Sequence, residues 1–152
     1  MKTRYFPVIV IIVTAFLMIS SCKKTDQAEL DRELIETYVA NNNLVGQFTE
    51  SGIFYIIDKP GGEEHPTSSS SVTVMYKGYR LDGSVFEEST NNISFPLSGV
   101  IRGWTQGLQL IGAGGEITLI IPSGLAYGYN GSGSINPNEV LGFDISLKSF
   151  TN

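Results

Sequence analysis

Apolar residues recur at two different periods along the chain, and each period predicts a different kind of element. Between residues 26 and 40 they recur every three or four positions, which predicts an amphipathic helix. The apolar positions of this helix are Leu30, Leu34, Ile35, Tyr38 and Val39. Asp26 and Glu29 form a capping-box pattern at its start. The acidic residues expected on its solvated face are Asp31, Glu33 and Glu36. We expect the apolar stripe to pack on this chain's own domain, with a second copy as the alternative.

From residue 53 onward the apolar positions alternate, which predicts short strands. The predicted strands cover residues 53–58, 72–77, 85–86, 93–97, 117–121 and 140–150. Asp82-Gly83 marks a tight turn between two of them. Stretches rich in Gly, Pro, Ser and Asn predict loops over residues 59–71 and 123–138.

Residues 101–111 return to helical spacing and predict one short helix. One face of this helix carries Ile101, Trp104, Leu108 and Ile111. Gly103 and Gly107 lower its helix propensity, so we expect a sheet to clasp it, with the glycines permitting close contact. The pattern as a whole predicts an α+β fold, in which a five- or six-stranded antiparallel sheet holds a short helix against one face.

The N-terminus has the pattern of a targeting segment. Lys2 and Arg4 are followed by the run 6–19, 14 residues in which Thr14 is the only hydroxyl-bearing or charged residue. The run is shorter than the roughly 20 residues that a membrane-spanning helix needs, and it fits the apolar region of a secretory signal.

The sequence Ile19-Ser20-Ser21-Cys22 resembles the lipobox of bacterial lipoproteins. The resemblance implies cleavage before Cys22 and attachment of lipid to this residue; an ordinary signal peptide with a chance cysteine is the alternative. Cys22 is the only cysteine of the chain, so it forms no internal disulfide. We therefore predict a signal peptide over 1–21, a lipid-anchored tether and helix over 22–48, and one globular domain over 49–152.

Charge excludes one class of partner. Without Lys2 and Arg4 the chain keeps 8 basic residues against 15 acidic ones, a net charge of −7. Nucleic-acid binding normally requires a clustered basic surface, so no nucleic-acid partner is expected. Membrane attachment would have to come from the lipid.

The candidate chemistry lies in two segments, Val100–Leu108 and Leu119–Gly128. They hold the only tryptophan, many glycines and a tyrosine between small residues, and no His, Cys or Asp cluster lies near them in sequence. Such residues predict an apolar pocket with an aromatic floor and one hydroxyl. A pocket of this kind suits binding or twisting an apolar group rather than hydrolysis, and no metal or cofactor is predicted.

The order of these segments resembles the FK506-binding (FKBP) type of peptidyl-prolyl isomerase. The matching segments, from about residue 72 to 147, are Val72–Gly78, Leu81–Phe86, Val100–Leu108, Gly112–Pro122 and Leu125–Gly128. The resemblance implies a sheet wrapped around a short helix and isomerase activity on proline-containing unfolded or nascent exported polypeptides. FK506-like macrolides are implied as possible ligands. A lipid-anchored form is similar to extracytoplasmic members in Gram-negative bacteria, facing the periplasm or the cell surface.

The resemblance also implies a set of site residues. Those implied as catalytic are Tyr76, Phe86, Glu87, Ile101, Trp104 and Tyr127; those implied as substrate-binding are Val100, Ile135 and Phe143. Trp104 would form the floor under the proline ring, while the Ile101 amide and the Tyr127 hydroxyl would hold carbonyl groups. Rotation of a peptide bond has a barrier of about 18–20 kcal/mol. An apolar pocket would favour the twisted amide, which is less polar than the planar one.

The sequence departs from the family at three places. Glu87 replaces the usual Asp, an aliphatic residue replaces an aromatic near Ile93, and the loop 129–134 is one residue short and rich in glycine, which predicts mobility. The next residues read Ile135-Asn136-Pro137 where the family has Ile-Pro-Pro. Two alternatives therefore stay open: a binding or chaperone module without catalysis, which Glu87 favours, and an inert structural domain of a surface lipoprotein.

Overall fold

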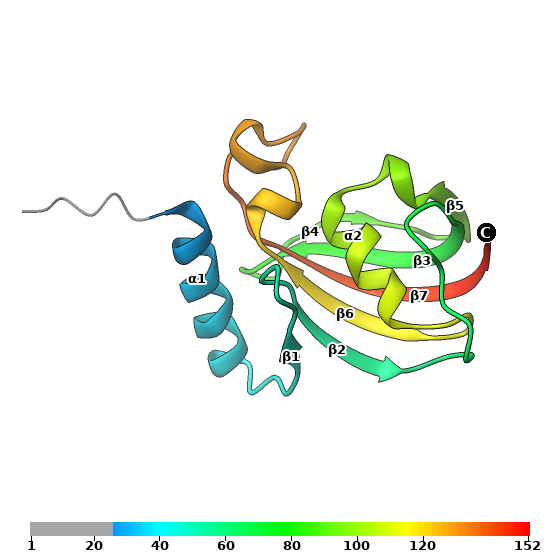
Figure 1. The fold of residues 1–152 in the computed structure, drawn as a ribbon. Coiled ribbons are helices and arrows are strands. Elements are labelled where there is room, and N and C mark those ends of the chain that lie inside the picture. Colours follow the sequence, from blue (N-terminus) through cyan, green and yellow to red (C-terminus); the bar gives the residue numbers. More distant parts are fainter. Residues whose placement is uncertain (1–25) are drawn as a thin grey trace, which may run out of the picture.

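The computed structural model describes residues 26–152, and in it seven strands form one antiparallel sheet (Figure 1). The strands are β1 (Gln47–Phe48), β2 (Phe54–Lys59), β3 (Ser71–Arg80), β4 (Val85–Glu88), β5 (Ile93–Pro96), β6 (Glu116–Ile121) and β7 (Leu141–Thr151). Their order is β1-β2-β6-β7-β3-β4, and β5 also pairs with β3. The six predicted strands are all present. The seventh, β1, is two residues long and carries no periodic signal; it lies just before the predicted domain boundary.

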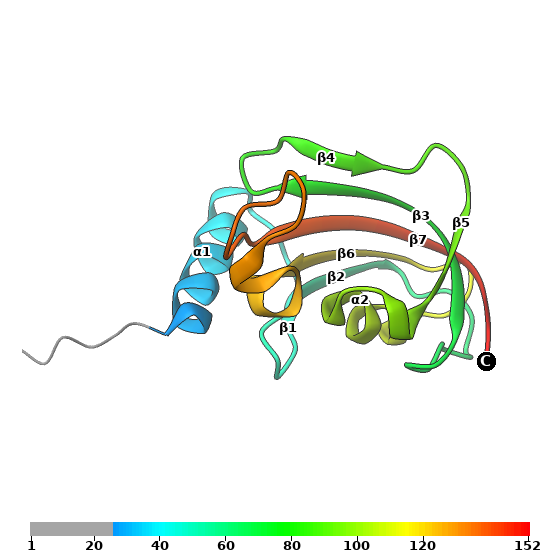
Figure 2. The ribbon, with the colours of Figure 1, turned by 90° about the horizontal axis from the view of Figure 1, so that it is seen from above.

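The short helix α2 (Arg102–Gly107) lies on one face of the curved sheet (Figure 2), and the turn η2 (Leu108–Leu110) continues it. A Cβ atom at Gly103 would lie 2.4 Å from the side chain of Ile121, and one at Gly107 would lie 2.4 Å from that of Leu119; both neighbours belong to β6. The glycines are therefore required by the contact between helix and sheet, as predicted. Trp104, Leu108 and other α2-side residues form the main hydrophobic core with the inner face of the sheet.

The N-terminal helix α1 (Gln27–Asn41) packs at one end of the sheet (Figure 1). Ile35 is fully buried there, in a second cluster with Phe54, Ile120 and Val140. Phe54 and Ile120 alternate along their strands with residues of the main core, so this cluster lies on the opposite face of the sheet. Burial of a side chain such as Ile35 stabilises the fold by about 2 kcal/mol. The favoured alternative, packing of the helix on its own domain, is confirmed.

Two details of the helix prediction are wrong. Leu30 and Leu34 are 41% and 51% exposed, because the helix turns the neighbouring face, with Ile35, toward the sheet. Asp26 occupies the N-cap position, but its side chain makes no capping hydrogen bond; its carbonyl oxygen accepts from the amides of Glu29 and Leu30.

Asp31 also differs from its prediction. It was expected on the solvated face, yet it is only 1% exposed. Its carboxylate accepts hydrogen bonds from the backbone N and the Oγ of Ser123, at 2.7 and 2.6 Å, and from Gln27 Nε2 at 2.7 Å. A buried carboxylate needs such partners, and Ser123 opens the turn η3 (Ser123–Leu125). Within residues 26–152 no helix is long and apolar enough to cross a membrane.

Candidate functional site

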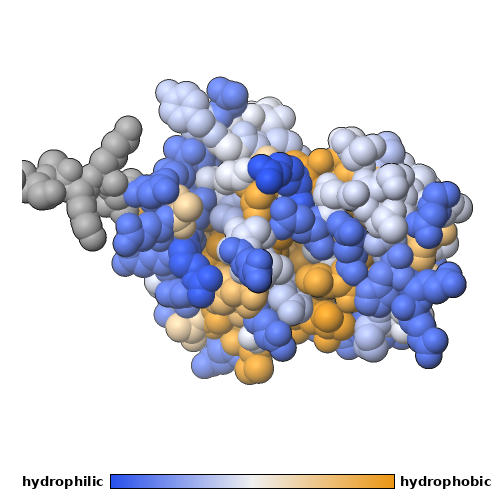
Figure 3. Space-filling model, viewed as in Figure 1, coloured by the Kyte–Doolittle hydropathy of each residue, from blue (hydrophilic) through white to orange (hydrophobic). Residues whose placement is uncertain are grey.

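A cleft of about 290 Å³ opens between α2, β3 and the segment after η3. Its lining residues are Tyr76, Glu87, Phe95, Gly99, Val100, Ile101, Trp104, Tyr127 and Phe143. Most of the predicted site residues thus come together from distant parts of the sequence. In the space-filling view, apolar surface gathers in the middle of the face that bears α2, and hydrophilic residues surround it (Figure 3).

Another hollow, of about 440 Å³, is lined by residues of several strands, and the carboxylates of Asp58, Glu88, Glu116 and Asp144 are among them. Among residues 26–152 no group of three or more His, Cys, Asp or Glu residues is placed to hold a metal ion. This hollow offers neither an aromatic floor nor the candidate segments. The smaller cleft is therefore the candidate site.

Trp104 forms the floor of the cleft and is 4% exposed. Three aromatic rings meet it edge-on, with centroids at 4.9 Å for Tyr76, 5.5 Å for Phe143 and 5.9 Å for Phe95. Perpendicular pairs of this kind add to the energy of burial. The indole Nε1 is the buried side-chain polar atom of the described residues that lacks a hydrogen-bond partner. Aromatic packing, rather than a hydrogen bond, holds the floor in place.

Phe95 is an aromatic wall residue that was not predicted for the site. The prediction near Ile93 was that an aliphatic residue replaces an aromatic one, and in the structure Phe95 lines the cleft. The register of β5 on β3 pairs Phe95 with Val72 and Ile93 with Val74, both buried, so the two side chains share one face of the strand; Phe95 reaches the cleft, whereas Ile93, at the start of β5, is 38% exposed. The alternation of apolar residues at 93, 95 and 97 was the available signal for this side chain.

Phe86 and Ile135 lie beside the cleft rather than in its lining. The Phe86 ring packs edge-on against Phe143, with centroids 5.7 Å apart. A Cβ on Gly78 would come within 2.6 Å of Phe86, so glycine at this position permits the contact. Ile135 is 7% exposed and belongs to the same buried cluster as Trp104. Both residues therefore support the cleft from behind its walls.

Two hydroxyl groups and one carboxylate supply the polarity of the cleft. Burial, followed by the Glu87 carboxylate, raises the pKa of the Tyr76 hydroxyl from 10.0 to about 12. Burial and the Glu87 charge also raise the pKa of Tyr127. Both hydroxyls are protonated at neutral pH; that of Tyr76 interacts with Glu87, and that of Tyr127 can donate a hydrogen bond to a ligand.

Backbone contacts fix the two sides of the cleft. Ser89 is buried and clamps Tyr76, because its Oγ accepts from the Tyr76 amide at 2.8 Å and its own amide donates to the Tyr76 carbonyl at 2.9 Å. Sequence reasoning missed Ser89, which lies in a polar stretch without periodicity. On the other side Thr105 Oγ1 donates to the Leu97 carbonyl oxygen at 2.7 Å, which holds α2 against the preceding turn. Within residues 26–152 the Ile101 amide donates to no protein acceptor and is available to a ligand.

The chain that forms this cleft is similar to known proteins. A family model described as FKBP-type peptidyl-prolyl cis-trans isomerase matches residues 62–148. A probable FKBP-type peptidyl-prolyl cis-trans isomerase FkpA from Neisseria meningitidis is 43% identical over 131 residues, which cover 82% of this chain and 48% of that protein. FkpA from Escherichia coli K12 is 36% identical over 136 residues, covering 82% of this chain and 50% of that protein. The chain thus spans about half the length of these relatives.

Two solved structures are also similar. The crystal structure of FkpA from Escherichia coli superposes with a TM-score of 0.73 at 37% identity, over 83% of this chain and 60% of that one. A peptidyl-prolyl cis-trans isomerase from Pseudomonas syringae pv. tomato has a TM-score of 0.71 at 33% identity, over 82% of this chain and 96% of that one. Each likeness thus extends over about four fifths of this chain.

Proposed function

The chain belongs to the FKBP-type peptidyl-prolyl cis-trans isomerases, and on this premise we propose that it catalyses rotation about X–Pro bonds in unfolded or nascent exported polypeptides. The observation that carries the proposal is the cleft itself: a buried tryptophan floor with aromatic walls and protonated hydroxyls. FK506-like macrolides would compete for the same cleft.

The proline ring would lie on Trp104, in contact with Tyr76, Phe95 and Phe143. The Ile101 amide and the Tyr127 hydroxyl would hold carbonyl oxygens on either side of the rotating bond. The planar amide is stabilised by resonance, and the twisted amide is less polar. Apolar walls therefore favour the twisted form, and catalysis follows from tighter binding of the transition state than of the ground state. No covalent intermediate is required.

A binding module without catalysis is the second candidate, and Glu87 is the residue that favours it. Its carboxylate is one methylene longer than that of Asp, the side chain is exposed, and its effect on the Tyr76 pKa is secondary to burial. A carboxylate this loosely placed would orient the tyrosines poorly.

The experiment that tests the proposal is the cis-to-trans isomerisation of a short X–Pro peptide by the chain from Lys24 onward, which contains every described contact. Acceleration that an FK506-like ligand suppresses supports the enzyme. Acceleration only after Glu87→Asp supports the binding module. A folded protein that fails to accelerate the reaction in either form contradicts the proposal.

The location proposed for the protein is the cell envelope, with lipid on Cys22 as the anchor. The support is the lipobox-like sequence; residues 1–25 lie outside the described part of the structure. The full chain should partition into the membrane fraction, and Cys22→Ala should remove it from that fraction. Equal partitioning of the two forms would contradict lipidation.

A further inference from the structure

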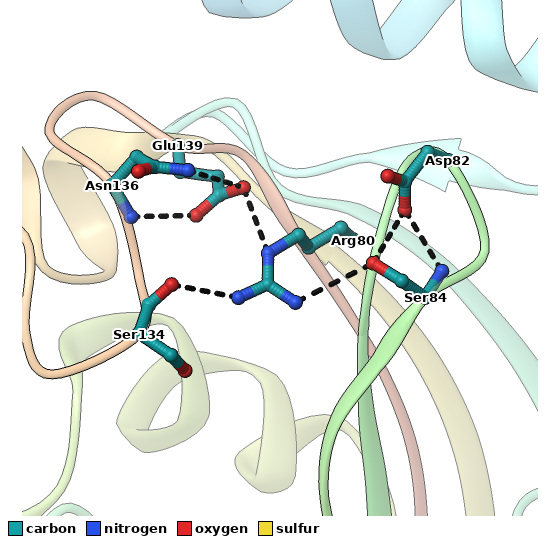
Figure 4. A network of polar contacts seen from close by, with 6 residues as sticks. All are labelled: Arg80, Asp82, Ser84, Ser134, Asn136 and Glu139. Carbon is teal, nitrogen blue, oxygen red and sulfur yellow. Dashed lines mark hydrogen bonds and ion pairs between the residues drawn. The ribbon is translucent and has the colours of Figure 1, made fainter.

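Arg80, the last residue of β3, lies between the turn that follows this strand and the loop 131–139 (Figure 4). Its Nε forms an ion pair with Glu139 Oε1 at 3.1 Å. One terminal nitrogen donates to the Ser134 carbonyl oxygen at 2.7 Å, and the other lies 3.4 Å from Ser84 Oγ. One guanidinium thus joins the turn after β3 to a loop whose Ser134 lies 54 residues after Arg80 in sequence.

The partners of Arg80 are themselves held in place. Glu139 Oε2 accepts a hydrogen bond from the Asn136 amide at 2.7 Å. Asp82 Oδ1 accepts from the amide and the Oγ of Ser84, at 2.8 and 2.6 Å. The Arg80 and Glu139 side chains are only 21% and 16% exposed, so water competes weakly for the pair. The planar fork of arginine satisfies several acceptors at once, which a lysine ammonium does not reproduce.

Both joined segments adjoin the cleft. The guanidinium carbon lies 5.6 Å from the centroid of the Phe86 ring, which packs on the wall residue Phe143. The loop follows Tyr127 closely in sequence and inserts Ile135 into the buried cluster of the cleft. Gly131 and Gly133 have φ angles of 64° and 54°. The backbone of the loop pairs Ser132 with Ile135, and the amides of Gly131 and Asn138 donate to the Gly128 carbonyl oxygen at 3.3 and 2.9 Å.

We propose that Arg80 is a positioning residue that fixes the loop 131–139 beside the cleft and so sets which X–Pro peptides the cleft accepts. The inference rests on the proposed function for its ligand class. A fixed loop discriminates between X residues of different size, whereas a loose loop accepts them more evenly. Residues 131–134 of this loop belong to the segment 129–134 for which the sequence predicted mobility, and Arg80 adds a side-chain restraint from β3 to the buried Ile135 and the backbone hydrogen bonds of the loop.

The test compares wild type, Arg80→Lys and Arg80→Met in the full chain, purified in detergent. Lys77→Met is the matched control, because Lys77 is also on β3 and forms an ion pair, with Asp144 at 3.2 Å, away from the cleft lining. The first readout is amide hydrogen exchange in residues 131–139. The second is the affinity for a series of X–Pro peptides, followed through the fluorescence of Trp104, the only tryptophan.

We expect loop amides to exchange about tenfold faster in both Arg80 variants, as the loss of one or two charge-assisted hydrogen bonds predicts. In the Arg80 variants the affinities for different X–Pro peptides should become more alike, and so should their KM values, while the kcat values keep their differences. Lys77→Met should change neither loop exchange nor the range of affinities. Unchanged loop exchange in Arg80→Met, or an equal loss of affinity for every peptide, would overturn the inference. Trp104 fluorescence reports binding whether or not the peptide is isomerised. A wild type that binds peptides without isomerising them would contradict the proposed catalysis, and the effect of Arg80 on binding could still be measured.

Discussion

At the scale of single residues, the cleft combines a floor held by packing with a hydroxyl that is free for a ligand. Trp104 is enclosed by three rings, so its position does not depend on a bound molecule. The Tyr127 hydroxyl, by contrast, has no hydrogen-bond partner within residues 26–152 and lines the cleft. We therefore expect that a change at Tyr127 affects ligand binding and leaves the stability of the fold unchanged, whereas a change at Trp104 affects both.

Tyr127→Phe tests this separation. The substitution should lower kcat/KM for an X–Pro peptide by about tenfold, the cost of one transition-state hydrogen bond. It should change the free energy of unfolding by less than about 0.5 kcal/mol, because no internal hydrogen bond is lost. Peptide isomerisation and urea unfolding measure the two quantities. A loss of stability without a loss of activity would assign Tyr127 to the core.

Alkaline pH should weaken the fold through the tyrosines of the cleft. The folded-state pKa of Tyr76 is about 12, above its ordinary value of 10.0, and burial raises that of Tyr127 as well. Between these values the folded chain holds the proton more tightly than the unfolded chain. The stabilisation is therefore fully present below about pH 10 and is lost as pH rises through about 12.

Urea unfolding at several pH values, with tyrosinate absorbance recorded alongside, checks this expectation. Tyr76→Phe removes one of the titrating groups, so its free energy of unfolding should fall less steeply over the alkaline range. If the two proteins lose stability with the same slope, Tyr76 is not responsible.

At the scale of elements, α1 is joined to the cleft side of the molecule by one buried carboxylate. Asp31→Ala should lower the free energy of unfolding by about 2–3 kcal/mol, because the Ser123 amide and hydroxyl lose their acceptor in a buried place. Glu33→Ala, on the exposed face of the same helix, is the matched control and should cost less than about 0.5 kcal/mol. Chemical unfolding of both variants decides between this expectation and a purely apolar attachment of the helix.

Elements with a strong period could be predicted from the sequence, and those fixed by tertiary contacts could not. The long strands and α2 follow the spacing of their apolar residues, and the glycines of α2 pointed correctly to close contact with a sheet. The strand β1 is too short to have a period, and the choice of which α1 face is buried depends on Ser123, 92 residues after Asp31. No local pattern contains that partner.

The same distinction applies to the residues of the site: those in local motifs could be predicted, and those placed by tertiary contacts could not. The motifs around Trp104 and Tyr127 predicted the floor and the hydroxyl of the cleft, and the structure brings both together. Phe95 was missed because its contact with Trp104 joins β5 to α2, and Arg80 because an isolated arginine in a strand carries no motif. Pair contacts between distant segments are what the linear pattern leaves out.

At the scale of the whole molecule, the two hydrophobic clusters share β2 and β6, whose alternate residues face opposite sides of the sheet. We expect them to unfold together. The transition followed by Trp104 fluorescence, which reports the main cluster, should coincide with that followed by far-UV circular dichroism, which reports the helices as well as the sheet. An earlier loss of helical signal would show that α1 detaches before the sheet unfolds.

The place of β7 in the sheet determines when the domain can fold during synthesis. This strand is the last to be made, yet it lies between β6 and β3 and pairs along the whole of β3. Before β7 is made, β6 can pair with β2, and β3 with β4 and β5, but no strand links these two parts of the sheet. The α1 residues Asp31 and Ile35 likewise lack some of their partners until Ile120, Ser123 and Val140 have been made. Folding that depends on such distant pairings is slow. A ribosome-bound chain that stops before Leu141 should stay open to proteases, and the cleft, which includes Phe143, can form only once β7 has emerged from the ribosome.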